Sequence, residues 1–238
     1  MSNMQKLPPL DGRMAAAASF VRKNAKIADI GTDHGYLPIT LLREGKISFA
    51  AAADIRKGPL DRAMANAAKY GVADKIQFFL TDGLQDIPLA ELGITDIVIC
   101  GMGGEGIARI LSGNAYIKKE NINLVLQPMT AIGKLRAYLT QNGFNIAEER
   151  IASSNGKLYQ CIAAQYDGVF RTYTPAELLL GKKNLLRGTE DSLFSPLLQK
   201  YIRKAQQEYT GKLRGKADTE EICILMEELT KIAKEKGI

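Results

Sequence analysis

The stretch FNIAEERIASSNGKLYQCIAAQY, residues 144–166, decides the fold of this chain. It contains two strand-like runs, 144–152 and 157–166, with only SSNG between them. Parallel strands need a crossover connection of about a dozen residues, whereas antiparallel strands can be joined by a short turn. The two runs therefore predict an antiparallel hairpin.

Upstream of this hairpin, short apolar runs alternate with patterns that are typical of helices. The predicted strands are 26–30, 48–54, 75–82, 94–101 and 121–128. These runs are almost continuously apolar, as in strands that are buried on both faces of a parallel sheet. Alternating strands and helices predict a doubly wound α/β fold. With the hairpin, they predict the Rossmann-like seven-stranded sheet of class I S-adenosylmethionine (SAM) methyltransferases, and not half of a dinucleotide dehydrogenase.

From about residue 174 the strand-like runs cease and helical patterns replace them. Thr174 is placed to cap a helix, and Pro175 suits its first position. Apolar residues then recur at three- and four-residue spacing in two stretches separated by the loop 210–218. This predicts an antiparallel, coiled-coil-like helical pair. We expect a SAM-binding domain over 1–166 and a C-terminal helical domain over 167–238.

The composition is that of an ordinary soluble globular protein, with 238 residues, 46% hydrophobic and 24% charged. This length accommodates one large domain, or a domain of about 160 residues with an appendage. No apolar run approaches the roughly 18 residues that span a bilayer, and the first residues carry no apolar signal segment. We expect a cytoplasmic protein with no membrane partner, and a monomer.

Metal chemistry is not indicated by the sequence. Cys100, Cys161 and Cys223 lie far apart, and there is a single histidine, so no metal-ligand spacing exists. We expect no metal. The net charge is +6, and a positive field favours polyanions such as nucleic acid, although many metabolic enzymes are equally basic.

The first predicted strand ends in a loop with two glycines, ADIGTDHGYLP at 28–38. In open α/β sheets, ligands bind at the carboxyl ends of the strands. Gly31 lets the backbone approach a ligand, and the helix that follows favours a carboxylate, which in SAM is that of its methionine part. A dinucleotide fingerprint would need glycine in place of Asp33 and Tyr36. A tight turn without any ligand remains the alternative.

Two further acidic residues end predicted strands. Asp54 can accept hydrogen bonds from both ribose hydroxyls, which suits SAM and NAD equally. Asp82 can accept from the adenine amine, and Gly83 permits close approach. The alternative is that Asp54 is simply a solvated carboxylate at a strand end.

The last two strand ends and the single histidine complete the candidate site. In CGMGGEGI, 100–107, the glycines leave one face without side-chain bulk, although such a loop can also serve strand–helix packing. In QPMT, 127–130, Gln127 is placed to hydrogen-bond a base edge. His34 suits a base, but we favour a ring that packs near the methionine end of the cofactor.

Taken in order, DIGTDHGYLP, ADI…GPL, TDGL, CGMGGEGI and LQPMT, with the hairpin and the helical tail, are similar to one family. The chain resembles the bacterial tRNA (adenine(22)-N(1))-methyltransferases from LDGRMAAAASFV to its end. The resemblance implies SAM as methyl donor, tRNA as substrate and a coiled-coil-like C-terminal domain. The cofactor-binding residues that we expect are Asp29, Gly31, Asp33, His34, Gly35, Asp54, Ile55, Asp82, Gly83, Gly101, Met102 and Gly103.

Methyl transfer to adenine N1 needs no base, because N1 carries a lone pair at neutral pH. Alignment in a dry pocket can then lower the barrier by roughly 7–11 kcal/mol. The product is a cation, so Asp29 or carbonyl groups in the 101–104 turn can stabilise the developing charge. Arg13, in a predicted basic helix over 12–26, is expected to line the target pocket. The catalytic candidates are Asp29, Arg13 and Gln127.

The charges of the tail are divided between its two halves. Residues 200–216 are basic except for Glu208, and residues 218–228 are acidic. These charges either form salt bridges between the helices or provide a basic face for the tRNA backbone. The apolar stripes either pack on the α/β domain or form a partly protruding pair, which we favour because the segment is separate and heavily charged.

Three other functions compete with this interpretation. They are a SAM methyltransferase with a small-molecule substrate, an NAD-binding oxidoreductase, and a non-catalytic RNA-binding protein that retains an empty fold. The hairpin and the missing third glycine argue against the oxidoreductase. The helical tail and positive charge argue against a small substrate.

Overall fold

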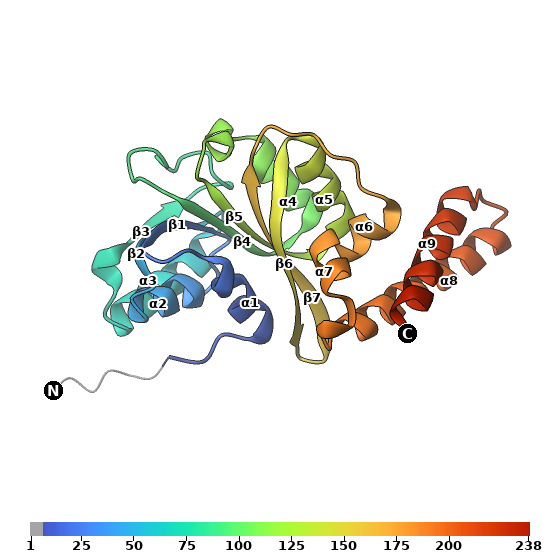
Figure 1. Ribbon diagram of the computed structural model, residues 1–238. Coiled ribbons are helices and arrows are strands. Elements are labelled where there is room, and N and C mark those ends of the chain that lie inside the picture. Colours follow the sequence, from blue (N-terminus) through green and yellow to red (C-terminus); the bar gives the residue numbers. More distant parts are fainter. Residues whose placement is uncertain (1–6) are drawn as a thin grey trace.

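The computed structural model describes residues 7–238, which form a seven-stranded mixed sheet with helices on both faces and a two-helix arm at one end (Figure 1). The strand order is β3-β2-β1-β4-β5-β7-β6, with β1 to β5 parallel and β7 antiparallel to both β5 and β6. The strands are β1 Ala25–Ile30, β2 Ile47–Asp54, β3 Ile76–Leu80, β4 Asp96–Gly103, β5 Asn123–Thr130, β6 Phe144–Ser154 and β7 Lys157–Tyr166. The predicted Rossmann-like fold is confirmed.

Two layers of helices cover the sheet. One face carries α1 Gly12–Phe20, α2 Tyr36–Arg43 and α3 Lys57–Lys69, and the other carries α4 Gly104–Ser112 and α5 Ile132–Gln141. Successive residues of a strand point to opposite faces, so Ile97 and Ile99 pack toward α4 and α5, whereas Val98 packs toward α1 to α3. Three short 3-10 helices, η1 Ala73–Lys75, η2 Ala115–Lys118 and η3 Gly188–Glu190, lie in connections.

The turn of the hairpin explains why its register is fixed locally. Asn155 and Gly156 connect the paired residues Ser154 and Lys157, and their φ angles are 49° and 70°. A two-residue turn with positive φ at both central positions matches the twist of antiparallel strands and favours Asn-Gly. The dipeptide therefore selects the pairing of β6 with β7.

The boundaries of β4 and β5 differ from the predicted ones. Both strands begin and end two residues later than expected, so the stretches CGMGG and QPMT are largely strand. The pairing shifts between Cys100 and Met102, where Gly101 has a φ of 78°. This irregularity lets β4 continue to Gly103 while the chain bends. The sequence had suggested that residues 100–104 form a loop.

The N-terminal helix is shorter than the predicted span of 12–26. It begins after Asp11, whose side chain accepts a hydrogen bond of 2.8 Å from the Met14 amide, and it ends at Phe20. Val21 is extended, so the basic residues that follow lie outside the helix.

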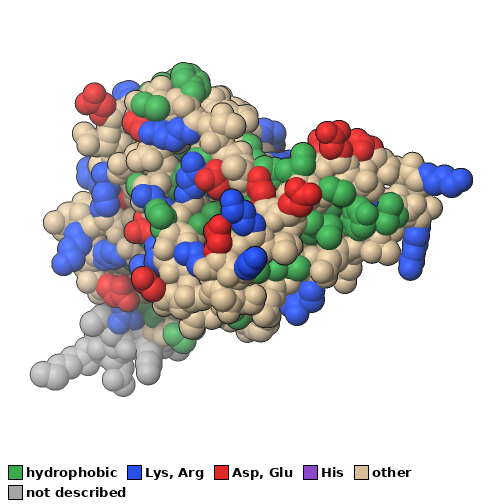
Figure 2. Space-filling model, turned by 45° about the vertical axis from the view of Figure 1, so that its right-hand side comes forward, with side chains coloured by type: hydrophobic (Ala, Val, Ile, Leu, Met, Phe, Trp, Pro, Cys, Tyr) green, Lys and Arg blue, Asp and Glu red, His purple; other side chains and the backbone are tan. Residues whose placement is uncertain are grey.

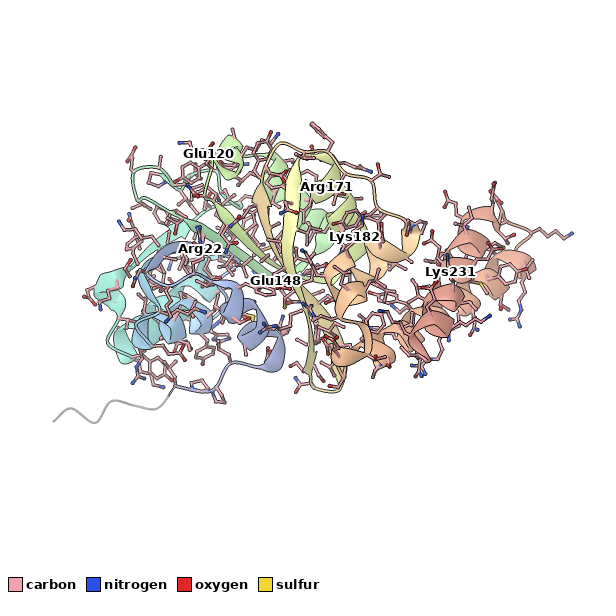
Figure 3. The ribbon with its side chains drawn as sticks, in the orientation of Figure 1. Arg22, Glu120, Glu148, Arg171, Lys182 and Lys231 are labelled. Atoms are coloured by element: carbon pink, nitrogen blue, oxygen red, sulfur yellow. The ribbon has the colours of Figure 1, made fainter. Side chains whose placement is uncertain are left out.

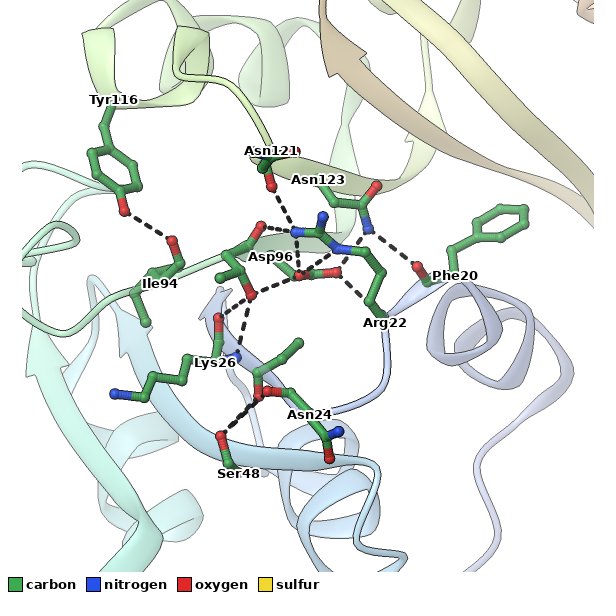
Figure 4. Close-up of polar contacts among 12 residues, drawn as sticks. Phe20, Arg22, Asn24, Lys26, Ser48, Ile94, Asp96, Tyr116, Asn121 and Asn123 are labelled. Atoms are coloured by element: carbon green, nitrogen blue, oxygen red, sulfur yellow. Dashed lines mark hydrogen bonds and ion pairs between the residues drawn. The ribbon is translucent and has the colours of Figure 1, made fainter.

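Arg22 instead anchors the end of α1 to the amino ends of β4 and β5 (Figure 4). Its Nε and Nη2 donate to Oδ2 of the buried Asp96 at 3.1 and 2.9 Å. Asn123 Nδ2 donates to Asp96 Oδ1 at 2.8 Å and to the Phe20 carbonyl at 3.1 Å. These bonds fix the helix on the sheet and so fix where its first turn, with Arg13, lies.

The segment after β7 forms two short helices. They are α6 Pro175–Leu180 and α7 Lys182–Arg187. Thr174 and Glu177 form a reciprocal capping box, which confirms the predicted N-cap. The break lies at Gly181, where φ is 86° and a Cβ would lie 2.3 Å from the Glu149 carboxylate.

The arm consists of α8 Phe194–Arg214 and α9 Glu220–Lys236, which pack against each other (Figures 1 and 2). Its base packs on α6 and β6, and its tip projects with basic side chains at the end (Figure 2). Within residues 7–238 no ion pair joins α8 to α9, so the salt-bridge interpretation of the divided charges has no support in the structure.

A buried polar network joins the helical segment to the sheet. The Arg136 and Glu149 side chains are fully buried, and Arg136 Nε donates to Glu149 Oε1 at 2.7 Å. Arg136 Nη2 donates to Gln160 Oε1 at 2.8 Å, and Gln160 Nε2 donates to the Tyr201 hydroxyl of α8 at 3.1 Å. This network joins residues on both sides of the expected boundary, so the two parts share a buried interface. The division into domains 1–166 and 167–238 stays a prediction.

Candidate active site

A cavity of about 620 Å³ opens at the carboxyl ends of the parallel strands. Its volume lies in the range of small-molecule sites. The predicted site residues that line it are Arg13, Asp29, Gly31, Asp33, His34, Gly35, Asp54, Gly101 and Met102. The structure therefore brings together the ends of β1, β2 and β4 with the first turn of α1.

The loop between β1 and α2 needs glycine at two positions. Gly31 has a φ of 81°, and a Cβ there would lie 2.4 Å from the Met102 side chain. Gly35 has a φ of 68° and is the N-cap residue of α2, without any side-chain cap. Both glycines hold the backbone in left-handed conformations that open the cavity wall.

Asp29 is the most unusual titratable group of the cavity. It is 6% exposed, and within residues 7–238 no basic side chain forms an ion pair with it. Burial raises the pKa of Asp29 from 3.8 to about 6, and the nearby Asp54 carboxylate adds to the rise, whereas the neighbouring Thr32 hydroxyl lowers the pKa. A buried carboxylate without a counter-ion in a cavity fits a ligand that brings a cation.

Asp54 is also buried but is partly engaged. Its Oδ1 accepts a hydrogen bond of 2.8 Å from the Arg56 amide and lies 3.7 Å from Arg56 Nε. The remaining carboxylate oxygen is available for a ligand's hydroxyl groups. Ile55, between them, is 64% exposed and does not line the cavity.

Arg13 and Gln127 are brought together, although Gln127 does not line the cavity. Arg13 Nη1 donates to Gln127 Oε1 at 3.1 Å and contacts the Met129 sulfur at 3.4 Å. Gln127 is fully buried, its Oε1 also accepts from the Gly101 amide at 3.2 Å, and its Nε2 donates to the Pro128 carbonyl. The expected contact of Gln127 with a base edge is not available in this arrangement, because its amide group is engaged within the protein.

His34 and Asp33 lie at the edge of the cavity. The His34 ring stacks on Tyr36 with centroids 5.5 Å apart, and its Nε2 lies 3.6 Å from Asp33 Oδ2. Asp33 Oδ1 accepts from Arg62 Nη2 at 2.9 Å. The half-exposed imidazole is held by stacking, in keeping with a packing role.

Asp82, Gly83 and Gly103 are not brought to this cavity. Asp82 lies 3.5 Å from Arg109 Nη1 and lines a separate space of about 60 Å³. A Cβ on Gly83 would contact Ile110 at 3.0 Å, so this glycine serves the packing of α4. The assignment of Asp82 and Gly83 to the adenosine stays a prediction.

Several lining residues were not singled out from the sequence. Thr32 and Met129 lie inside motifs that drew attention for their other residues, and Arg56 follows Asp54 directly. Tyr159 does not line this cavity and had no signal in the sequence, yet the Arg13 guanidinium lies 5.9 Å from its ring centroid. No group of three or more potential metal ligands occurs within residues 7–238.

This chain is similar to known methyltransferases. A family model described as a methyltransferase domain matches residues 10–162. The tRNA (adenine(22)-N(1))-methyltransferase of Bacillus subtilis is 30% identical over 221 residues, which cover 89% of each chain.

Two solved structures extend the similarity to bound ligands. One is a putative tRNA (m1A22) methyltransferase of Streptococcus pneumoniae in complex with S-adenosyl-L-methionine, with a TM-score of 0.79 and 28% identity over 92% of this chain and 97% of that one. The other is an M. capricolum protein in complex with the natural cofactor product S-adenosyl-homocysteine, with a TM-score of 0.74 and 25% identity over 98% and 99% of the two chains.

Proposed function

This chain belongs to the family of tRNA (adenine(22)-N(1))-methyltransferases, and we propose that it transfers a methyl group from SAM to N1 of adenine 22 in tRNA. The observation that carries the proposal is the cavity at the ends of β1, β2 and β4, with an unpaired buried carboxylate at its floor. The similarity to a tRNA methyltransferase over 89% of the chain supports the substrate class.

The residues of the cavity suit the parts of SAM. Asp29 is placed to hold the α-ammonium group, which supplies the counter-charge that the protein itself does not provide. Asp54 is placed to accept hydrogen bonds from the ribose hydroxyls. The β1–α2 loop, with Gly31 and Gly35, presents backbone to the cavity for the carboxylate.

SAM, when bound, would supply a methyl group on a sulfonium sulfur. The lone pair of adenine N1 would form the bond to that methyl carbon as the carbon–sulfur bond breaks and leaves a neutral thioether. The protein does not need to remove a proton from N1, so its contribution is to align the base and exclude water. Positive charge passes to the adenine as the methyl group moves. The Asp29 carboxylate and the carbonyl groups of the 101–104 turn are the groups near the cavity that can stabilise that charge.

Arg13 is a positioning candidate for the target nucleotide. A guanidinium cannot stabilise a second cation, so Arg13 is unsuited to stabilising the methylated base. Its Nη1 is held by Gln127 and its Nε by Asp11 at 3.1 Å, which fixes the planar group at the wall of the cavity. A fixed guanidinium is suited to stacking on a base or to binding a phosphate.

We assign the protein to the bacterial cytoplasm, where tRNA is modified, and to action as a monomer. No helix within residues 7–238 is long and apolar enough to cross a membrane. Within residues 7–238 the basic residues of α8 form no ion pair with the acidic residues of α9, and they give a surface suited to the RNA backbone.

Ligand-dependent thermal stability and methyl transfer test the proposal together. SAM and S-adenosylhomocysteine should raise the melting temperature, and NAD should not. Radiolabel from SAM should then appear in unmodified tRNA and not in a pool of small metabolites. Stabilisation by NAD alone would favour the oxidoreductase, and transfer only to small molecules would favour the small-substrate methyltransferase.

A further inference from the structure

A second groove lies beside the cavity, between the end of β5, the first turn of α5 and the arm helix α8. Its volume is about 410 Å³. Met129 lines both spaces, so the groove begins where the cavity ends. The groove side carries Tyr159, Lys200 and Lys204, none of which the cofactor cavity contains.

The partition between the two spaces is made of three side chains. Arg13 Nη1 contacts the Met129 sulfur at 3.4 Å, and the Arg13 guanidinium lies 5.9 Å from the centroid of the Tyr159 ring. Arg13 therefore belongs to the cavity wall, and Tyr159 forms the groove side of the same wall. A base in the cavity and a second base over Tyr159 would be neighbours.

The opposite wall of the groove is basic. Lys200 and Lys204 are four residues apart on α8 and face the groove together, with Glu208 one turn further on. Lys200 Nζ donates to the Leu158 carbonyl at 3.3 Å, and neither lysine forms an ion pair within residues 7–238. Burial and the nearby Lys204 lower the pKa of Lys200, so an anion between the two ammonium groups would relieve their repulsion.

The position of these two lysines on α8 also distinguishes them from the other basic residues of that helix. Arg203 lies on the same helix but does not line the groove. A general attraction to RNA would use Arg203 and Lys204 alike. A built nucleotide site would use Lys200 and Lys204 in preference to Arg203.

We propose that this groove binds the nucleotide adjacent to the target adenine, with its base stacked on Tyr159 and its phosphate between Lys200 and Lys204. This subsite rests on the proposed function, because it requires an RNA substrate. An adenine that enters the cavity leaves its stack, and its neighbour loses a stacking partner. An aromatic platform replaces that partner, and the two lysines hold the backbone in the register that places the adenine against Arg13.

The test compares matched variants of the full chain with unmodified tRNA. Tyr159→Leu should raise the KM for tRNA roughly tenfold, as loss of one base–aromatic stack does, with little change in kcat. Tyr159→Phe should behave as the wild type, because no hydrogen bond of the Tyr159 hydroxyl is present among the described residues. Lys200→Met/Lys204→Met should lower the slope of log affinity against log salt by about 0.7–0.9 for each lost phosphate contact.

Two further variants serve as references. Lys231 lies on α9, beside α6 and α7 and away from the groove, and Lys231→Met should leave KM and the salt slope unchanged (Figure 3). Arg203→Met should weaken binding less than Lys204→Met. The SAM dissociation constant and the melting temperature of each variant show that the fold and the cofactor cavity are intact.

The outcomes separate this subsite from the proposed function. A wild-type enzyme that methylates tRNA, with Tyr159→Leu unchanged in KM or with Arg203→Met as damaging as Lys204→Met, would overturn the subsite alone. A wild type that binds SAM but methylates no tRNA would overturn the proposed function, and with it the RNA substrate on which the subsite depends.

Discussion

The guanidinium of Arg13 donates a hydrogen bond of 3.1 Å to Oε1 of Gln127, although 114 positions separate the two residues. The same oxygen accepts from the Gly101 amide at 3.2 Å. One buried amide therefore ties together the first turn of α1, the turn in β4 and the end of β5, which form part of the wall of the candidate active-site cavity.

This relationship predicts that Gln127 acts through Arg13. Gln127→Met keeps a similar volume but removes the acceptor, and kcat/KM for tRNA should fall roughly tenfold, as for loss of a buried hydrogen bond to a charged group. In an Arg13→Met background, the same substitution should have a much smaller effect. Steady-state kinetics on the four members of this double-mutant cycle measure the coupling. If the two losses are additive, Gln127 does not position Arg13.

The raised pKa of Asp29 predicts a pH dependence of SAM binding. If the ionised carboxylate holds the ammonium group, the dissociation constant should rise by up to tenfold for each pH unit below about 6 and level off above it. Titration calorimetry between about pH 5 and 7.5 measures the profile. Asp29→Asn should bind SAM far more weakly, with a flat profile. A wild-type affinity that does not change over this range would exclude the role of Asp29.

The same group predicts how the stability of the ligand-free protein varies with pH. The pKa of Asp29 in the folded protein lies above its ordinary value of 3.8, so the protonated form stabilises the fold fully below about pH 3.8. That contribution is lost as the pH rises to about 6, and the rise in pKa corresponds to about 3 kcal/mol.

Asp29→Asn is neutral at every pH and does not suffer this loss. Its free energy of unfolding, relative to the wild type, should therefore increase by about 2.4 kcal/mol between pH 4 and pH 7. Urea denaturation without ligand at both pH values measures the difference. An equal difference at the two pH values would show that Asp29 is not buried in a charged form.

Most of the features that were predicted from the sequence depend on residues that are close together in the chain. The Asn155-Gly156 turn, the continuously apolar strands and the Thr174–Glu177 capping box depend on neighbouring residues, so the sheet, the hairpin and the start of α6 were predictable. That Asp29 and Asp54 line one cavity was predictable, because parallel strands bring their carboxyl ends to one edge of the sheet.

What the sequence missed depends on contacts between distant residues. Gly181, at the break between α6 and α7, has a φ of 86°, and the Glu149 carboxylate occupies the space that a Cβ would need. Nothing near Gly181 in the chain indicates this contact. Tyr159 reaches Arg13 because β7 lies beside β5, and Gln127 Oε1 accepts from Arg13 Nη1 and the Gly101 amide, both distant in the chain. Asp82 lies outside the cavity, 3.5 Å from Arg109 of α4, and its expected contact with the adenosine stays a prediction.

The Arg136–Glu149 pair predicts a large effect on stability. Arg136→Met leaves the Glu149 carboxylate buried without a counter-ion, and the free energy of unfolding should fall by about 3–5 kcal/mol. Arg136→Met/Glu149→Met should recover much of the loss. Lys57→Met, which removes an exposed pair with Asp61, should cost less than about 1 kcal/mol. Urea denaturation of the four proteins measures these differences, and a loss of equal size for both single variants would contradict the importance of burial.

The most direct test of the central claim is to map the methyl group on the RNA. The enzyme is incubated with SAM and with two unmodified transcripts of one tRNA, one with adenine and one with guanine at position 22, and N1-methyladenosine is located by reverse-transcription arrest and mass spectrometry. The account predicts one methyl group, at N1 of adenine 22, and none in the guanine transcript. Equal methylation of both transcripts, or a methyl group at any other atom or position, would contradict it.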